Sequence, residues 1–134
     1  LSRAMYWVNR GVPYSQTYET YDPQGRYYRM DCSGFVSMAL HLGSSPNTEG
    51  LINYVYRINW SDLRPGDIVG TLGPGTGGNY GHVVIFNGWA NSAHTSFYTL
   101  EERGSVGAVA YVRSVGFQVG SNYALPYRYN KITG

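Results

Sequence analysis

The sequence predicts an α+β fold in which N-terminal helices pack on an antiparallel β-sheet. Segments with a helical apolar pattern lie within the first 43 residues, whereas segments rich in β-branched and aromatic residues, separated by glycines, follow from about residue 67. Helices first and strands afterwards is an order typical of α+β proteins. With 134 residues and no repeat or linker, we expect one domain spanning 1–134.

Two helices are expected near the N-terminus. Ser2 is a candidate N-cap and Gly11 a stop for a first helix with an apolar stripe. Residues 12–30 combine prolines, glycine, tyrosines and polar side chains, which favours an irregular surface segment. The stretch 32–42 is apolar on nearly every side, with Asp31 as its N-cap and Gly43 as its C-terminal cap, so it predicts a buried helix.

The later elements follow in order along the chain. A further helix is expected from about Thr48, and a turn then leads to a strand that begins near Asp67. A glycine-rich connection at 73–81 precedes the stretch 82–89, which has a high β propensity. Because this connection lacks the Lys-Ser/Thr of a phosphate-binding loop, we expect it to form the rim of a substrate cleft. Further strands are expected within 97–104, 107–115 and 123–131.

Composition excludes several classes of function. The net charge of +2 comes without any run of Lys or Arg, so no nucleic-acid partner is expected. A single cysteine excludes a disulfide framework and a cysteine-based zinc site, and the histidines form no metalloprotease motif, so neither metal nor cofactor is expected. No apolar run is long enough to span a membrane, and no secretion signal lies within the sequence.

The one cysteine lies where a helix start would activate it. If Asp31 caps the helix, Cys32 is the first helical residue, where free backbone N–H groups and the macrodipole stabilise a thiolate and lower its pKa. Ser33 and Gly34 are small enough to let a substrate carbonyl approach. The alternative, a packing cysteine, would need none of these features.

A cysteine nucleophile also needs a base, and three histidines are available. His41 lies nine residues along the same helix, about 13 Å away at a rise of 1.5 Å per residue, and cannot reach Cys32. His82 opens an apolar strand, where a polar ring has little reason to lie unless it faces a cleft. We therefore predict His82 as the base.

Together these residues resemble the NlpC/P60 cysteine peptidases and their CHAP amidase relatives. The resemblance is carried by "VPY" (12–14), "DCSGFV" (31–36), "DLRPGDIV" (62–69) and "GHVVIFNG" (81–88), in the family's order. It implies a papain-like core, hydrolysis of peptide bonds in bacterial peptidoglycan next to D-glutamate and diaminopimelate, and a site in which the Tyr14 hydroxyl, with Ser33 and Asp31, assists the oxyanion or the substrate. Tyr14 could equally be a packing tyrosine.

Two residues compete to be the third catalytic member, which orients the base. The resemblance offers His94, twelve residues after His82, as in NlpC/P60 enzymes, or a later glutamate, Glu101, as in CHAP-like ones. A turn centred near Ala93 would place Glu101 roughly opposite Ile85 and leave His94 at the hairpin tip, whereas a tight turn around Gly88 would favour His94. Glu102 is then expected on the opposite side of the strand, and whichever of His94 and Glu101 is not the third member is expected to be an ordinary polar surface residue.

The resemblance therefore predicts a secreted or cell-wall cysteine endopeptidase, monomeric, that acts on peptidoglycan stem peptides. Three alternatives stay open. The same site could belong to an N-acetylmuramoyl-L-alanine amidase or to an acyltransferase, or the chain could be a catalytically inactive cell-wall binding module.

Overall fold

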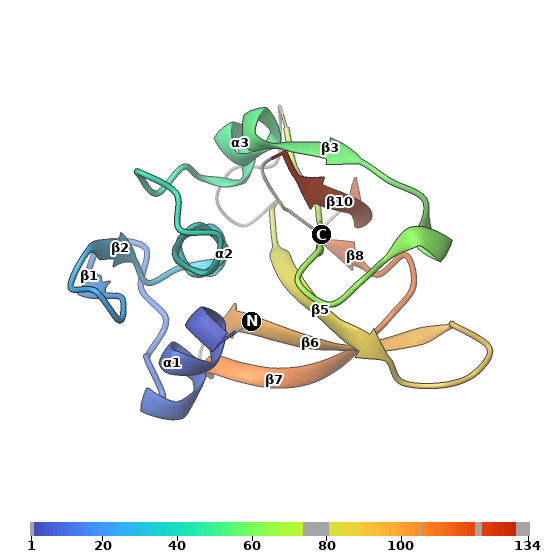
Figure 1. Cartoon of the computed structure of the whole chain (residues 1–134), viewed down its shortest axis with the longest axis horizontal. Coiled ribbons are helices and arrows are strands. Elements are labelled where there is room, and N and C mark those ends of the chain that lie inside the picture. Colours follow the sequence, from blue (N-terminus) through green and yellow to red (C-terminus); the bar gives the residue numbers. More distant parts are fainter. Residues whose placement is uncertain (1, 74–80, 105, 120–121, 131–134) are drawn as a thin grey trace.

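A computed structural model describes residues 2–73, 81–104, 106–119 and 122–130. Within them, six strands form one antiparallel sheet in the order β3-β10-β4-β5-β6-β7. Helix α1 packs against β6 and β7, and α2 packs against β5 and β6, so the helices cover one face of the sheet (Figure 1). The predicted α+β class is confirmed. The elements named here are α1 (Ser2–Arg10), α2 (Cys32–Ala39), β3 (Val55–Arg57), β4 (Ile68–Gly70), β5 (Val83–Trp89), β6 (Ser96–Arg103), β7 (Gly107–Ser114) and β10 (Leu125–Tyr129).

The alternation of side chains along the strands produces an apolar cluster on each face of the sheet. On β5, Val83 and Ile85 join the cluster beneath α1 and α2, whereas Val84 and Phe86 join a second cluster on the other face. Leu100 of β6 belongs to the helix side. Neighbouring residues of a strand therefore point to opposite faces of the sheet, and every second residue points to the same face.

The segment 12–30 is more regular than the sequence predicted. It contains a two-stranded antiparallel hairpin of β1 (Glu19–Tyr21) and β2 (Tyr27–Arg29). The Asp22 carboxylate organises the turn. It accepts hydrogen bonds from the backbone N–H groups of Gln24 and Arg26 and forms an ion pair with Arg3. Pro23 and Gly25 lie within the tight turn between the two strands, so they connect the strands of a hairpin rather than exclude regular structure.

Two predicted helices end earlier than expected. Helix α2 stops at Ala39, and His41 rather than Gly43 takes the left-handed backbone at φ 59°. The helix that begins at Thr48 covers only α3 (Thr48–Leu51), is followed by a 3₁₀ turn (Ile52–Tyr54) and then becomes β3. Pairing with β10 outweighs the weak helical preference of these β-branched and aromatic residues.

A bulge in β5 sets the register of the β5–β6 hairpin. Ile85 pairs with Leu100, but farther along the hairpin Trp89 pairs with Phe97, so β5 holds one extra residue between Phe86 and Trp89. Gly88 lies in this interval with φ 106°, a conformation that glycine adopts without strain. The expected pairing of Ile85 with Glu101 is therefore wrong by one residue.

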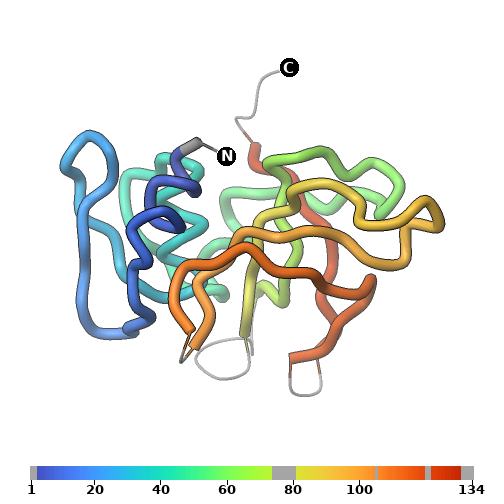
Figure 2. The backbone as a smooth tube through the Cα atoms, turned by 90° about the horizontal axis from the view of Figure 1, so that it is seen from below, coloured from blue at the N-terminus to red at the C-terminus, as the bar shows by residue number. Residues whose placement is uncertain are grey.

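The sheet topology brings four strand ends together at one end of the sheet. Because the pairs are antiparallel, the end of β4, the start of β5, the end of β6 and the start of β7 meet there (Figure 2). Asp67 and Arg128 brace the neighbouring strand: the Arg128 Nη2 lies 2.8 Å from the Asp67 Oδ2, and Asp67 also accepts the Arg64 backbone N–H. The "RPGD" stretch thus forms a structural turn at the start of β4, at the opposite end of that strand from the four strand ends.

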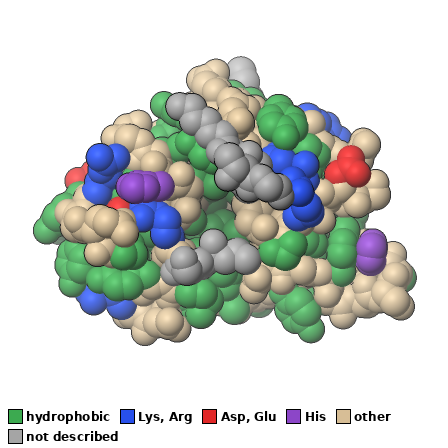
Figure 3. All heavy atoms as spheres, in the orientation of Figure 1, with side chains coloured by type: hydrophobic (Ala, Val, Ile, Leu, Met, Phe, Trp, Pro, Cys, Tyr) green, Lys and Arg blue, Asp and Glu red, His purple; other side chains and the backbone are tan. Residues whose placement is uncertain are grey.

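Two further surface features bear on function. No described helix is both long and apolar enough to cross a membrane. On the face shown in Figure 3, the Lys and Arg side chains lie in separate groups, with hydrophobic and uncharged side chains between them. The described part of that face therefore carries no continuous basic stripe.

Candidate active site

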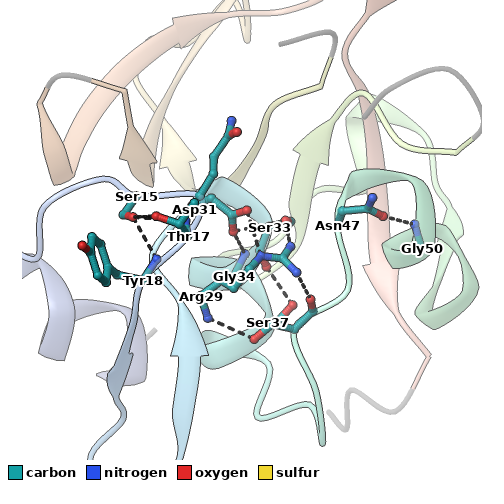
Figure 4. Close-up of polar contacts among 12 residues, drawn as sticks. Ser15, Thr17, Tyr18, Arg29, Asp31, Ser33, Gly34, Ser37, Asn47 and Gly50 are labelled. Carbon is teal, nitrogen blue, oxygen red and sulfur yellow. Dashed lines mark hydrogen bonds and ion pairs between the residues drawn. The ribbon is translucent and has the colours of Figure 1, made fainter. Parts of the chain in front are cut away.

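Cys32 is the first residue of α2, and Asp31 is its N-cap, as predicted. The Asp31 Oδ1 accepts a hydrogen bond of 2.7 Å from the Gly34 backbone N–H. The Arg29 Nε lies 3.1 Å from the other carboxylate oxygen, and Arg29 also donates to the Ser45 carbonyl (Figure 4). This network fixes the turn from β2 into the helix and thereby the position of the cysteine.

The structure explains the glycine at position 34 differently from the sequence, which suggested access for a substrate. A Cβ atom at this position would overlap the backbone carbonyl of Arg29 and crowd the Asp31 carboxylate. Glycine is therefore required by the close approach of the preceding strand rather than by access for a substrate. It is a packing feature of the helix start.

The Cys32 thiol is buried, with 7% of the residue exposed. Its pKa is raised to about 12: burial is the main cause and the Asp31 charge adds to it, while hydrogen bonds from backbone N–H groups, among them those of Val83 and Ser33, lower it. The expectation of a lowered pKa is therefore wrong for the unliganded protein, because loss of hydration outweighs the helix terminus. The Cys32 side chain is therefore a neutral thiol at neutral pH.

His82 and Glu101 lie side by side at this end of the sheet. The His82 Nε2 is 2.9 Å from the Glu101 Oε1. Glu101 is fully buried and also accepts hydrogen bonds from Thr99 at 2.5 Å and from Arg113 at 2.5 and 3.2 Å. Burial disfavours its charge, but the bonds from His82, Arg113 and Thr99 prevail and lower the pKa of Glu101 to about 2.

Cys32 and His82 approach the same part of the cleft. The sulfur lies beside the backbone N–H of Val83, the residue that follows His82. Two adjoining hollows, one lined by Cys32 and one by His82, share Tyr14 and Gly81. Among the described residues, no hydrogen bond joins the thiol to the imidazole. Because Glu101 binds Nε2, the Nδ1 of His82 is the nitrogen left to accept a proton.

Tyr14 lies at the junction of the two hollows. The backbone around it is held on both sides, since Val12 accepts from Ala108 at 2.9 Å and Ser15 donates to Met30 at 2.9 Å. The pKa of Tyr14 is raised, chiefly by burial and also by the negative charge of Asp31, although a hydrogen bond from Gln16 lowers it. The hydroxyl therefore stays protonated and can donate a hydrogen bond.

Ser33 lines the Cys32 hollow together with Asp31. Its hydroxyl lies 3.4 Å from the Asp31 Oδ1, and 3.4 Å from an Arg29 nitrogen. The residue is almost fully buried. Both Ser33 and Asp31 are therefore engaged in holding the helix start.

His94 lies at the other end of the hairpin from His82. It adopts a left-handed backbone at φ 56°, in the turn between β5 and β6. Its ring stacks on Trp89, with ring centroids 4.3 Å apart and planes inclined by 1°. The structure thus brings Glu101, and not His94, to His82.

Glu102 points away from Glu101, as the sequence predicted. It lies on the opposite side of β6 from Glu101, but there it is fully buried, and neither carboxylate oxygen has a hydrogen-bond partner among the described residues. Burial, with a contribution from the Asp31 charge, raises the pKa of Glu102 to about 8. The opposite face of the strand is the core beneath the helices, not solvent.

Most of the glycine-rich connection predicted as the cleft rim lies outside the described residues. Gly81, its last residue, lines both hollows. Within the described chain, no group of three or more His, Cys, Asp or Glu side chains could hold a metal ion.

Comparisons with known proteins add a likeness of fold. No family model matches the chain, and no curated relative matches it. A crystal structure from Staphylococcus aureus, described as "similar to lipoprotein, NLP/P60 family", superimposes with a TM-score of 0.57 at 17% identity. The match covers 96% of this chain but only 39% of that one. The chain therefore has the fold of an NLP/P60 family protein over less than half of that protein's length.

Proposed function

We propose that this chain is a cysteine peptidase that cleaves peptide bonds in bacterial peptidoglycan. The observation that carries the proposal is the 2.9 Å contact between His82 and Glu101, beside a cysteine at a helix N-terminus. A nucleophile, a base and an orienting acceptor are the parts that acyl transfer needs. The fold shared with an NLP/P60 protein supports the choice of a cell-wall substrate.

The proposed reaction starts from a neutral thiol. The Nδ1 of His82 takes the Cys32 proton as the sulfur attacks the carbonyl carbon, and Glu101 stabilises the resulting imidazolium. The Tyr14 hydroxyl and backbone N–H groups at the start of α2 donate hydrogen bonds to the oxyanion. His82 then protonates the leaving amine, and water attacks the thioester with His82 as base, which releases the acid and restores the thiol.

The raised pKa of Cys32 gives this mechanism a distinct signature. The rate of alkylation by iodoacetamide should rise with pH well beyond 8.5, the ordinary pKa of a cysteine, because the free thiol ionises only at high pH. The measurement is the second-order labelling rate between pH 6 and pH 11, followed by mass spectrometry. A plateau already reached at pH 7 would instead indicate a preformed thiolate–imidazolium pair.

An N-acetylmuramoyl-L-alanine amidase is the second candidate. The observation that favours it is the identity of the third residue, since a glutamate in this role resembles the CHAP-like relatives. The two reactions share every step and differ only in the amide that enters the cleft. We also propose that the protein works outside the cell or in the cell wall, where this substrate lies.

The deciding experiment is digestion of purified peptidoglycan followed by mass analysis of the soluble fragments. New peptide termini within the stem indicate an endopeptidase, and peptides freed from muramic acid indicate an amidase. Cys32→Ala and His82→Ala should each abolish release, and the double variant should be no worse than either single one. Circular dichroism of each variant controls for folding. Binding without any release by the wild-type protein would favour a binding module.

A further inference from the structure

Glu102 is a buried acid to which the proposed reaction gives no part. It is fully buried, and neither of its carboxylate oxygens has a hydrogen-bond partner among the described residues. A buried polar group without a partner costs stability, and an apolar side chain of similar size would suit the core beneath the helices better. Stability therefore gives no reason for an acid at this place.

The register of the sheet sets Glu102 beside the residue that contacts the nucleophile. Ile85 of β5 pairs with Leu100 of β6. Two residues nearer the cleft, the same register sets Val83 opposite Glu102, so their side chains share one face of the sheet. Val83 belongs to the same apolar cluster as Cys32, and its backbone N–H donates to the Cys32 sulfur.

A second neighbour of Glu102 leads to Tyr14. Ala108 of β7 pairs with Glu102, and its backbone N–H donates to the Val12 carbonyl at 2.9 Å, two residues before Tyr14. When Glu102 is ionised, its negative charge acts to raise the pKa of Tyr14. Tyr14 and Cys32 line the same hollow. The acid therefore lies beneath the part of the cleft that these two residues form.

The groups that face Glu102 carry negative charge or none. Its titratable neighbours are Asp31 and Cys32 at the start of α2 and Tyr14 in the segment after α1. The strands β5 and β7 and helix α1 contribute apolar side chains to the cluster around it, namely Val83, Ala108, Ala4 and Trp7.

The basic side chains of this part of the molecule are engaged elsewhere. Arg29 pairs with Asp31. The two arginines of α1 bind side chains of the β1–β2 hairpin, Arg3 through Asp22 and Arg10 through Tyr21. The basic groups on the other face of the sheet gather around Glu101, and they are His82, Arg103 and Arg113. No described cation therefore compensates a charge on Glu102.

We propose that ionisation of Glu102 switches the cleft off at alkaline pH. A negative charge beneath Cys32 opposes formation of the thiolate, and a negative charge near Tyr14 opposes an oxyanion bound there. Burial, with a contribution from the Asp31 charge, raises the pKa of Glu102 to about 8, so the acid is neutral in weakly acidic solution and becomes charged as pH rises through that value. The effect on Cys32 needs no substrate, and only the effect on turnover rests on the proposed function.

The test compares the alkylation of Cys32 by iodoacetamide in the wild-type protein and in Glu102→Gln between pH 6 and pH 10. Both proteins should react at the same rate near pH 6, where Glu102 is neutral. Above pH 9 the glutamine variant should react about fivefold faster or more, because only the wild-type protein carries a charge beneath the thiol. Mass spectrometry gives the rates, and circular dichroism at each pH confirms that both proteins are folded.

Two further variants make the comparison specific. Glu102→Met also lacks an ionisable group and should behave like Glu102→Gln, which keeps the test decisive if one of the two variants folds poorly. Glu19→Gln removes an exposed acid of β1 and should react like the wild-type protein at every pH. On a cleaved peptide, the ratio of kcat/KM between Glu102→Gln and wild type should rise over the same pH range.

The outcomes separate this proposal from the proposed function. A labelling ratio between Glu102→Gln and wild type that stays constant from pH 6 to pH 10 overturns the switch. The same rise in Glu19→Gln also overturns it, since the effect would then follow from net charge alone. A ratio that rises with pH in a protein that cleaves no peptidoglycan supports the switch and counts against the peptidase.

Discussion

Glu101 and Glu102 are neighbours in the chain, yet they occupy opposite faces of β6 and opposite electrostatic environments. Glu101 receives hydrogen bonds from Arg113 and Thr99 and lies 2.9 Å from His82, and its pKa falls to about 2. Glu102 has no partner among the described residues, and burial raises its pKa to about 8. Both side chains are fully buried.

The comparison shows that burial alone does not determine the charge of a carboxyl group. What separates the two glutamates is the set of donors on each face of the sheet: arginine, threonine and histidine on one, and an apolar core on the other. At neutral pH, Glu101 is ionised and can orient a base, whereas Glu102 is largely protonated and cannot. Four measurements would sharpen or break this contrast.

The largest expected difference is in turnover. Glu101→Gln keeps the shape of the side chain but removes its charge, so kcat should fall by roughly 10²- to 10⁴-fold with little change in KM. Glu102→Gln should stay close to wild type, because it replaces a neutral acid with a neutral amide. Steady-state kinetics on one peptide substrate gives both values. The contrast is broken if Glu102→Gln is the more severe variant.

The second difference is in the pH dependence of stability. Because the folded-state pKa of Glu102, about 8, exceeds its ordinary value of 4.5, unfolding releases a proton between those pH values and stability falls as pH rises. The slope should approach about 1.4 kcal/mol per pH unit and vanish in Glu102→Gln. Glu101, with a pKa of about 2, adds stability that is present above pH 4.5 and is lost as pH falls toward 2.

Urea unfolding at intervals from pH 2 to pH 9 measures both effects, and the difference between wild type and each glutamine variant isolates one carboxyl. Identical pH profiles for wild type and Glu102→Gln would show that Glu102 finds a partner in solution.

The third difference concerns replacement by an apolar side chain. Glu102→Met should stabilise the protein by about 1–2 kcal/mol at pH 7, because an unpartnered polar group leaves the core. Glu101→Met should destabilise it by about 3 kcal/mol, since Arg113 loses its buried counter-charge. Thermal unfolding of the two variants under one condition gives the comparison. Equal losses of stability would mean that the two faces of β6 do not differ as described.

The smallest expected effect is that of His94→Ala. His94 lies in the turn and stacks on Trp89, so its loss should reduce kcat less than about tenfold, through the shape of the hairpin alone. The assay is the one used for Glu101→Gln. A loss comparable to that of Glu101→Gln would give His94 a direct part in the reaction.

Much of the framework could be predicted from the sequence because the deciding signals are local. The glycine-separated β-prone segments predicted β4, β5, β6, β7 and β10, and the Asp31 side chain at the start of an apolar run predicted a capped helix. These features depend on residues close together in the chain. The β1–β2 hairpin escaped prediction because its turn depends on Asp22, whose partner Arg3 comes from a different element.

The site was harder to predict because its properties depend on distant neighbours. The pKa of Cys32 follows from how deeply α2 is buried against the sheet, which no local pattern reveals. The burial of Glu102 could not be predicted, because strand alternation distinguishes two faces but does not say that helices cover the second. Gly34 was explained by substrate access because the carbonyl of Arg29 lies against it only in the folded chain.

The extra residue in β5 near Gly88 determines which glutamate lies beside the histidine. Trp89 pairs with Phe97, and extending that register without the bulge would set Glu102 opposite Val84 and Glu101 opposite Ile85. Opposite residues share a face, so a β5 strand of the same length that paired without the bulge would exchange the two side chains between His82 and the core, whereas deletion of the extra residue would keep Ile85 opposite Leu100 and Glu101 beside His82. Relatives without the extra residue would therefore carry their orienting residue one position nearer to the histidine in sequence, and columns for this position should be matched by superposition rather than by counting from the histidine.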